Sequence, residues 1–135
     1  MSGNLRFLNP AALDKPPGYT PVVEMTGPGR VIYVSGQLGV SGGTLVGEPG
    51  DFRAQAVKAF ENVRVALAEV GADFRHVVKM NSYLTDMKHL TTLREVRDTF
   101  LNTAAPPAST TIEITKLARE GAMFEIEVVA VLPPA

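Results

Sequence analysis

Two glutamates stand two positions apart in an otherwise apolar stretch at positions 123–132. Residues two apart on a strand project from the same face of a sheet, so Glu125 and Glu127 should lie side by side. Two neighbouring carboxylates, one of them partly desolvated, have separated pKa values, and this arrangement suits proton transfer. We therefore treat the pair as candidate acid–base residues, with ordinary solvated strand glutamates as the alternative interpretation.

Glu113 is a third acidic candidate, on a strand expected at 110–115, where Thr111 and Thr115 share its face. We expect this strand and the last one, at 123–132, to be neighbours and antiparallel across a loop at 117–122. Like charges brought together repel, so at least one of the three carboxylates should pair with a cation. The candidate cations are Lys79, Lys116 and Arg119.

Ser35 precedes Gly36 at the end of a β-branched and aromatic segment, expected to be a strand over 30–35 that stops at Gly36. A nucleophilic serine needs a base within hydrogen-bond reach, but neither histidine lies near it in sequence. A turn serine is the better interpretation. Tyr19 follows a Pro-Pro-Gly turn and either lines a pocket or packs to hold its loop.

The composition describes an ordinary globular chain, expected to form one domain over 1–135. Its formal net charge of −1 gives no broad electrostatic surface for nucleic acid. It has no cysteine and two histidines, His76 and His89, so neither a thiolate nor a histidine-rich metal site is expected. The first residues lack a signal-peptide core, and no apolar run approaches the roughly 18 residues of a membrane span. We expect a cytoplasmic protein without a cofactor.

The elements that must position these residues follow from periodicity. Strands are expected at 20–25, 30–35, 76–85, 110–115 and 123–132, with a glycine-rich hairpin or loop at 39–50. Asp51 should cap a helix that Gly71 closes as its C′ residue, and Asp86 should cap a second. The first apolar face comprises Phe52, Ala56, Ala59, Phe60, Val63, Leu67 and Val70. The second comprises Leu90, Leu93, Val96 and Phe100. In the strand at 76–85, apolar Val78, Met80 and Leu84 alternate with Lys79, Asn81 and Tyr83.

Two helices can cover only one face of a sheet of five or six strands. On the last strand the uncovered face would carry both glutamates among apolar residues, if the alternate positions face the helices. These uncovered residues are Met123, Glu125, Glu127, Val129 and Val131. A half-apolar face with two carboxylates predicts a partly buried interface between subunits.

Six segments in this order resemble the Rid (YjgF-like) family, also labelled endoribonuclease L-PSP. They are Gly18-Tyr19-Thr20, Val31 to Gln37, Phe60-Glu61-Asn62-Val63, Val77 to Met87, Pro107-Ala108 and Phe124 to Ala130. The resemblance implies a chorismate-mutase-like α+β fold, with one mixed sheet carrying two helices on one face. It also implies a homotrimer with small-molecule clefts between subunits.

The resemblance also implies roles for individual residues. Tyr19, Ser35 and the backbone around Gly36 would line the cleft, and Glu125 would position the attacking water. Two further residues would bind the substrate: Ser109, just before the strand at 110–115, and Thr111, within it.

Ser109 stands where deaminating members of the family have an arginine that grips the substrate carboxylate. A hydroxyl cannot replace a charge-assisted, often bidentate contact. The loss is worth about 1.5–3 kcal/mol, roughly ten- to a hundredfold in binding. Arg119 or Lys116 is a candidate replacement cation.

Three hypotheses follow. The first is a trimer that binds a small metabolite and, if it is an enzyme, acts as a hydrolase that deaminates an enamine or imine less dependent on its carboxylate. The second is a non-catalytic ligand sensor or protein-binding homologue. The third, an endoribonuclease or translation inhibitor, has against it the charge balance and the absence of a basic run.

Overall fold

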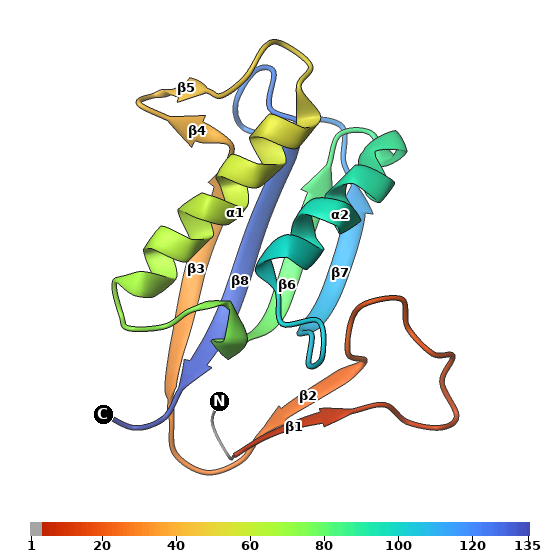
Figure 1. Ribbon diagram of the computed structural model, residues 1–135, viewed down its shortest axis with the longest axis vertical. Helices are drawn as coiled ribbons and strands as arrows, with labels where there is room; N and C mark the ends of the chain where they lie inside the picture. The colour runs from red at the N-terminus through yellow and green to blue at the C-terminus, as the bar shows by residue number, and fades with distance from the viewer. Residues whose placement is uncertain (1–3) are drawn as a thin grey trace.

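The main sheet of the computed structural model, which describes residues 4–135, has four strands. In spatial order they are β3 (Arg30–Leu38), β8 (Phe124–Leu132), β6 (Val77–Leu84) and β7 (Ala108–Glu113). β8 runs antiparallel to β3 and β6, whereas β7 runs parallel to β6 (Figure 1). The fold is therefore α+β with a mixed sheet, as expected, but the described sheet has four strands rather than five or six.

Two short antiparallel ladders lie outside the main sheet. One pairs β1 (Leu5–Leu8) with β2 (Val22–Met25), so the strand predicted at 20–25 begins two residues later and gains a partner that was not predicted. The other pairs β4 (Val40–Ser41) with β5 (Thr44–Leu45). This second ladder confirms the hairpin predicted in the glycine-rich stretch.

The first helix, α1 (Phe52–Ala68), begins and ends at the predicted signals. The Asp51 carboxylate accepts a hydrogen bond of 3.0 Å from the backbone N–H of Ala54, which satisfies one of the free donors of the first turn. Beyond the helix, Gly71 adopts a φ of +79°, and the N–H of Ala72 donates to the carbonyl of Leu67. These are the bonds of a Schellman motif with glycine at C′.

The second helix, α2 (Leu90–Phe100), buries its predicted apolar face but starts later than expected. Asp86 caps the 3₁₀ turn η2 (Met87–His89) that precedes the helix, by accepting from the N–H of Lys88 at 2.9 Å. A second 3₁₀ turn, η1 (Phe74–His76), delays the start of β6 to Val77.

Two apolar positions were placed wrongly by simple periodicity. Val70 lies beyond the end of α1 and is 40% exposed. In β6 the register against β8 shifts between Val77 and Lys79, so Val77 is fully buried and Val78 only partly. An irregularity of one residue moves the following side chains to the other face of a strand.

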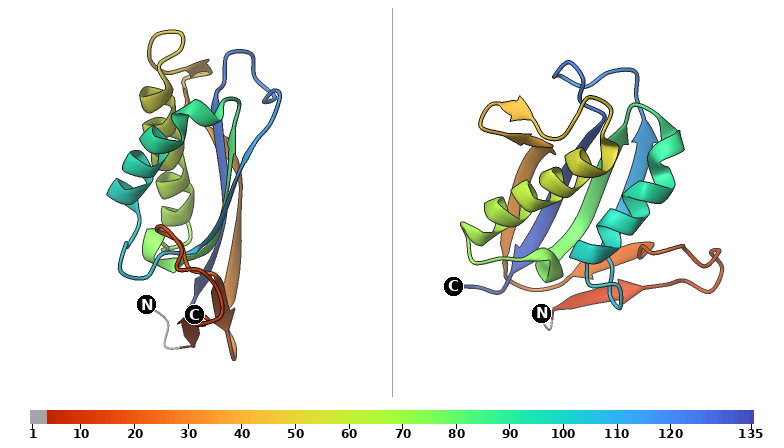
Figure 2. Two further views of the ribbon diagram at one scale, coloured as in Figure 1. Left: turned by 90° about the vertical axis from the view of Figure 1, so that its right-hand side faces the viewer. Right: turned by 45° about the horizontal axis from the view of Figure 1, so that its top comes forward.

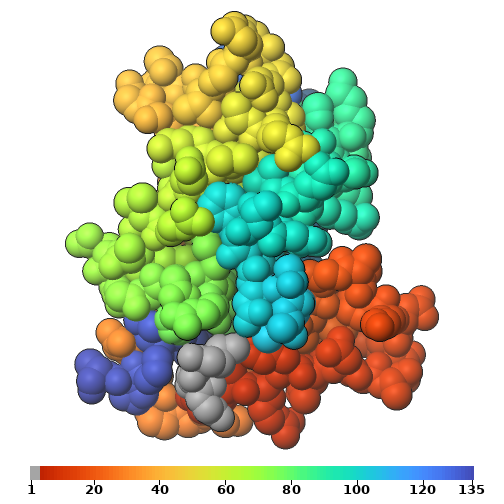
Figure 3. Space-filling view, viewed as in Figure 1, coloured from red at the N-terminus to blue at the C-terminus, as the bar shows by residue number. Residues whose placement is uncertain are grey.

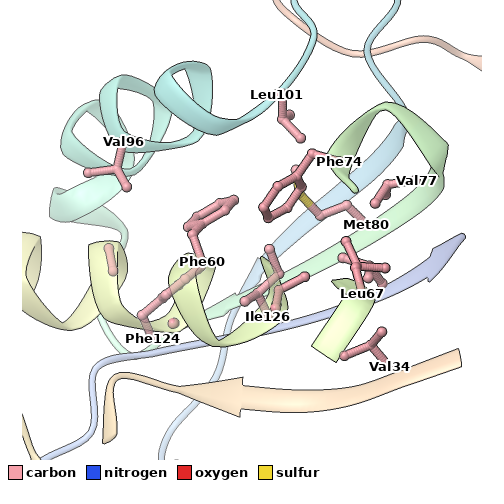
Figure 4. Close-up of a cluster of buried hydrophobic side chains, with 14 of the residues drawn as sticks. Val34, Phe60, Leu67, Phe74, Val77, Met80, Val96, Leu101, Phe124 and Ile126 are labelled. Atoms are coloured by element: carbon pink, nitrogen blue, oxygen red, sulfur yellow. The ribbon is translucent and has the colours of Figure 1, made fainter. Parts of the chain in front are cut away.

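Both helices pack on the same face of the sheet, and the opposite face, called here the open face, carries no helix (Figure 2). Between the layers, Phe60 stacks on Phe124 and Phe100 with ring centroids 5.8 and 5.1 Å apart, and Phe74 completes the aromatic cluster (Figure 4). Burying such side chains supplies most of the stabilisation of the fold, about 1.5–3 kcal/mol each. This core fixes which face each strand residue presents.

The strands β7 and β8 run in opposite directions but are not neighbours, because β6 lies between them. The expectation that they form adjacent strands across the loop at 117–122 is therefore wrong. The chain leaves β6, passes through α2 and returns parallel to β6 on its free edge, so β7 pairs with β6 alone. β8 then pairs on the other side of β6, where it reaches both β6 and β3.

The strand β3 continues past Gly36, where it was predicted to stop. Its register against β8 shifts between Val34 and Gln37, so Ser35 and Gly36 form a bulge. A bulge bends the strand and turns nearby side chains toward a new direction, and glycine often marks such a position. The bulge faces the glutamates of β8.

Candidate functional site

The strand β8 carries Glu125 and Glu127 on the open face, as predicted. The residues between and beside them, Phe124, Ile126, Val128 and Ala130, are buried under the helices. Both glutamates are half-buried. They therefore lie on a central strand, held by pairing on both sides, with their carboxylates on the face that no helix covers.

Glu127 is held by two side chains of β6. The Tyr83 hydroxyl donates to the Glu127 carboxylate at 2.7 Å, and the amide of Asn81 donates to the same oxygen at 3.2 Å. The hydrogen bond from the phenol to Glu127 raises the pKa of Tyr83 above its usual value, and the nearby charges of Glu127 and Glu125 raise it further. These bonds hold Glu127 in one orientation, which suits a supporting role rather than proton exchange.

Glu125 lies against the bulge of β3. A Cβ added to Gly36 would lie 1.8 Å from Oε2 of Glu125 and 2.7 Å from its carboxyl carbon. Real side chains never approach so closely, so the carboxylate occupies the space that only a glycine leaves free. The bulge and the absence of a side chain at position 36 together determine where Glu125 lies.

None of the three expected cations pairs with these carboxylates. Lys79 donates to the hydroxyl of Thr110 at 2.9 Å, Lys116 pairs with Glu120 at 3.4 Å, and Arg119 donates to the carbonyl of Gly43. Within residues 4–135, no ion pair involves Glu125. Glu127 instead accepts hydrogen bonds from Tyr83 and Asn81, and Glu125 is partly exposed to solvent.

Two adjoining hollows on the open face meet at Glu127. One, of about 340 Å³, is lined by Glu125, Tyr83 and the loop after β7. The other, of about 260 Å³, is lined by Ser35, Asn81 and the strands β3 and β8. The structure thus gathers three of the predicted site residues, Ser35, Gly36 and Glu125, on one surface.

Ser109 and Thr111 lie on the other side of the sheet. In β7 they pair with Met80 and Ser82, which are buried under the helices, so their side chains face the helical layer. Glu113 shares that side, and its carboxylate accepts from the N–H of Met87 at 2.7 Å. Glu113 is therefore a cap for η2 and not a third carboxylate beside Glu125 and Glu127, contrary to expectation.

Tyr19 lies near the beginning of β7. Its neighbour Thr20 is buried, donates its N–H to the carbonyl of Pro107 at 3.1 Å and its hydroxyl to the carbonyl of Pro106. Tyr19 is 37% exposed and lines a hollow of about 520 Å³ with other residues of segment 9–21 and with Pro106. The corner formed by segment 9–21, the end of α2 and the first residues of β7 is called here the β7 corner. Figure 3 shows segment 9–21 beside the connection that follows α2.

One charged residue at the β7 corner was not considered from the sequence. The guanidinium of Arg97, in the last turn of α2, lies against the bare Cα of Gly18, where an added Cβ would be 2.5 Å from Nη2. Arg97 directly follows Val96, which belongs to the apolar face of α2. This position indicates that the Arg97 side chain lies at the border between the buried and the exposed sides of the helix. The sequence offers no sign that segment 9–21 lies there.

Residues 4–135 hold no group of three or more histidine, cysteine, aspartate or glutamate side chains placed to bind a metal ion. Neither α-helix in that range combines the length and apolar character of a membrane-spanning segment.

Comparison with known proteins yields consistent matches. The sequence model of a family described as Endoribonuclease L-PSP matches residues 11–132. Protein DfrA of Myxococcus xanthus is 37% identical over 103 residues, which cover 76% of this chain and 77% of that protein. The 2-iminobutanoate/2-iminopropanoate deaminase of Mus musculus is 37% identical over 107 residues, covering 78% and 76%.

The fold has close counterparts among solved structures. The Rid-family protein YyfB from Yersinia pestis, a protein of unknown function, superposes with a TM-score of 0.85 and 29% identity, covering 96% of this chain and 99% of that one. RidA from Psychrobacter sp. PAMC 21119 gives a TM-score of 0.71 at 30% identity, with 82% and 88% covered. Sequence and fold thus agree over most of the chain, and the protein belongs to the Rid (YjgF-like) family, described as Endoribonuclease L-PSP.

Proposed function

We propose that the protein is a hydrolase that deaminates small imines in clefts between the subunits of a homotrimer. The named activity of the mouse relative, a 2-iminobutanoate/2-iminopropanoate deaminase, supports this class of reaction. The observation that carries the proposal is the position of Glu125, a carboxylate with no ion pair among residues 4–135, placed by Gly36 at the edge of an open hollow.

The proposed reaction needs one water molecule and a group that moves protons. Glu125 takes a proton from the water as the water oxygen bonds to the imine carbon, and it returns that proton to the nitrogen, which has received the π electrons of the C=N bond. In the resulting carbinolamine, Glu125 takes the hydroxyl proton as the C=O bond forms and the C–N bond breaks, and it passes this proton to the departing nitrogen. The products are a carbonyl compound and ammonia, and the carboxylate is regenerated. General acid–base help of this kind contributes about 10²–10⁴-fold to a rate.

The predicted site residues are divided between two surfaces of one copy, and this division supports an active site shared by two subunits. Ser35 and Glu125 lie on the open face, whereas Tyr19 and Ser109 lie at the β7 corner. A ligand touching all of them needs the open face of one copy beside the β7 corner of another. The open face also exposes Tyr33 (80%), Val31 (47%) and Ile112 (43%), which assembly would cover.

The test is ammonia release from 2-iminobutanoate generated in situ by an amino-acid oxidase. Glu125→Gln keeps the shape of the side chain but cannot accept a proton, so kcat should fall about 10²–10⁴-fold. The control is Glu69→Gln, because Glu69 is exposed at the C-terminal end of α1, on the helical side of the sheet, and its loss should leave the rate unchanged. Equal rates in the wild type and Glu125→Gln would rule out the role assigned to Glu125.

A second candidate function is ligand binding without turnover, and the serine at position 109 favours it. If substrate orientation depends on an arginine that the chain lacks, the cleft would bind a ligand without aligning it for hydrolysis. Ser109→Arg distinguishes the two functions. Ammonia release only in this variant would identify the wild type as a binding protein, whereas release by the wild type would support the hydrolase.

A further inference from the structure

Arg97 is an inward-lying cation on the helical side of the sheet. Its side chain is only 11% exposed, although it ends in a charged group. Nε donates to the carboxylate of Asp98 at 2.8 Å, and within residues 4–135 the two Nη nitrogens have no hydrogen-bond partner. The guanidinium therefore keeps free the pair of donors that binds a carboxylate in two parallel hydrogen bonds.

The position of this guanidinium is defined by two parts of the chain that are far apart in sequence, segment 9–21 and the end of α2 with the connection that follows it. Its Nη2 lies against Gly18, which has a φ of +87° and no side chain to block the approach. Two residues later, Thr20 is hydrogen-bonded to Pro106 and Pro107. The views of Figure 2 agree that segment 9–21 runs beside the connection from α2 to β7. Arg97 thus lies at the β7 corner, together with Tyr19.

Ser109 belongs to the same corner. It follows Pro107 by two residues and faces the helical layer that contains α2. The two cations considered from the sequence are not at this corner, since Lys116 and Arg119 are on the loop between β7 and β8, at the opposite end of β7 (Figure 1). Lys116 lines the hollow beside Glu125 on the open face. Each of the two cations also has a partner, Glu120 and the carbonyl of Gly43 respectively.

We propose that Arg97 binds the carboxylate of the substrate, and that this chain therefore acts on 2-imino acids despite having serine at position 109. The inference rests on the proposed function, and it specifies the substrate class. In the proposed cleft, Nη1 and Nη2 hold the two carboxylate oxygens, the Ser109 hydroxyl supplies a further donor, and Glu125 of another copy reaches the imine carbon. Asp98 accepts a hydrogen bond only from Nε and is half exposed, so it orients the guanidinium and leaves Nη1 and Nη2 free to donate to a ligand.

The affinity for 2-oxobutanoate, measured by calorimetry, tests this proposal without requiring turnover. Arg97→Gln should weaken binding about ten- to a hundredfold, the range for loss of a charge-assisted contact. Binding of butanone, which lacks the carboxylate, should not change. Arg94→Gln is the matched control, because Arg94 is exposed one turn earlier on the same helix.

A second substitution distinguishes a role of Arg97 in ligand binding from a role in holding segment 9–21 in place. Adding Ser109→Arg to Arg97→Gln should restore affinity for 2-oxobutanoate, because it returns a guanidinium to the corner, whereas lost loop packing would not be repaired. Arg97→Lys keeps a charge beside Gly18 and should retain an intermediate affinity, which covers the case in which the glutamine variant is unstable. Equal affinities for 2-oxobutanoate in Arg97→Gln and Arg94→Gln would overturn the proposal, as would failure of the wild type to bind it.

The two proposals fail in different ways. If the wild type binds 2-oxobutanoate through Arg97 but releases no ammonia from 2-iminobutanoate, the proposed hydrolase function is wrong and the role proposed for Arg97 is supported. If the wild type and Arg97→Gln release ammonia with the same KM, the hydrolase stands and Arg97 is not the carboxylate-binding residue.

Discussion

The open face around Glu125 and the β7 corner around Arg97 are built in different ways. On the open face, Glu125, Glu127, Tyr83 and the bulge at Gly36 belong to adjacent strands of one sheet, so backbone pairing sets their spacing. At the corner, the end of α2 meets segment 9–21, which is held there by the hydrogen bonds of Thr20. The groups proposed for chemistry thus have rigid support, whereas those proposed for substrate recognition depend on loop packing.

This difference suggests which part of the molecule changes with substrate. In the role proposed for Arg97, a cation at strand position 109 or at helix position 97 would serve the same corner, and neither position belongs to the hydrogen-bonded group around Glu125 and Glu127. A change in the open-face network would instead move the group that activates water.

The largest expected effect comes from separating the two surfaces. Tyr33→Glu places a charge on the exposed apolar part of the open face, where an interface between copies would bury it at a cost of several kcal/mol. Sedimentation velocity should show monomers, and ammonia release should be lost because each site would lack half of its residues. Val65→Glu, on the outer surface of α1 and 71% exposed, should leave both unchanged. An active monomeric Tyr33→Glu would show that one subunit contains the whole site.

Gly36→Ala should disrupt the open face alone. The new Cβ would overlap Oε2 of Glu125, so the carboxylate must move, and kcat should fall about a hundredfold or more if Glu125 is the base. The affinity for 2-oxobutanoate at the corner should change much less. Combining Gly36→Ala with Glu125→Gln should cost little beyond Glu125→Gln, since both remove the same function. Additive losses would mean that Gly36 acts independently of Glu125.

A smaller effect is expected from loosening the corner. Thr20→Val removes the hydroxyl that donates to Pro106 and leaves that carbonyl short of a partner, which should lower the free energy of unfolding by about 1 kcal/mol. KM for 2-iminobutanoate should rise while kcat stays nearly constant. Thr99→Val loses a similar bond, to Val96 within α2, and should destabilise the fold without raising KM. The same KM in both variants would separate segment 9–21 from substrate binding.

The smallest expected effect concerns the hydrogen bond between Tyr83 and Glu127. Because Glu127 raises the pKa of Tyr83 above its usual 10, the bond stabilises the fold fully below pH 10 and is lost as pH rises through the folded pKa. Solvent screens this pair, so Tyr83→Phe should cost no more than about 1 kcal/mol at pH 8. The difference from wild type in urea-unfolding free energy should shrink above pH 10. A difference that grows there would contradict this account.

Local signals account for what could be predicted from the sequence. Asp51 and Gly71 bracket α1 because capping depends on residues within one or two turns, and the alternation of β8 placed Glu125 and Glu127 correctly. The order of the strands could not be predicted locally, since β6 lies between β7 and β8 through pairings across the whole chain. For the same reason the side of the sheet occupied by Glu113 was missed.

The candidate site shows the same limit. The interaction between Gly36 and Glu125 depends on a bulge in β3 opposite β8, and Arg97 acquires its neighbours from segment 9–21, almost 80 positions earlier. Periodicity and capping describe neither contact. The family resemblance identified Glu125 and Tyr19 as candidates, but it could not show that they lie on different surfaces of one copy.

The central position of β8 has a consequence for the order of folding. It is the last described element in the chain, yet both β3 and β6 pair with it. During synthesis, therefore, β3 has no partner in the main sheet and β6 can pair only with β7 until residues 124–132 have left the ribosome. Until then their unpaired backbone groups are open to other chains, as are those of any nascent chain with an unfinished sheet. Cooperative folding must wait for this final strand, and a chaperone that shields nascent β-strands should raise the yield of soluble protein.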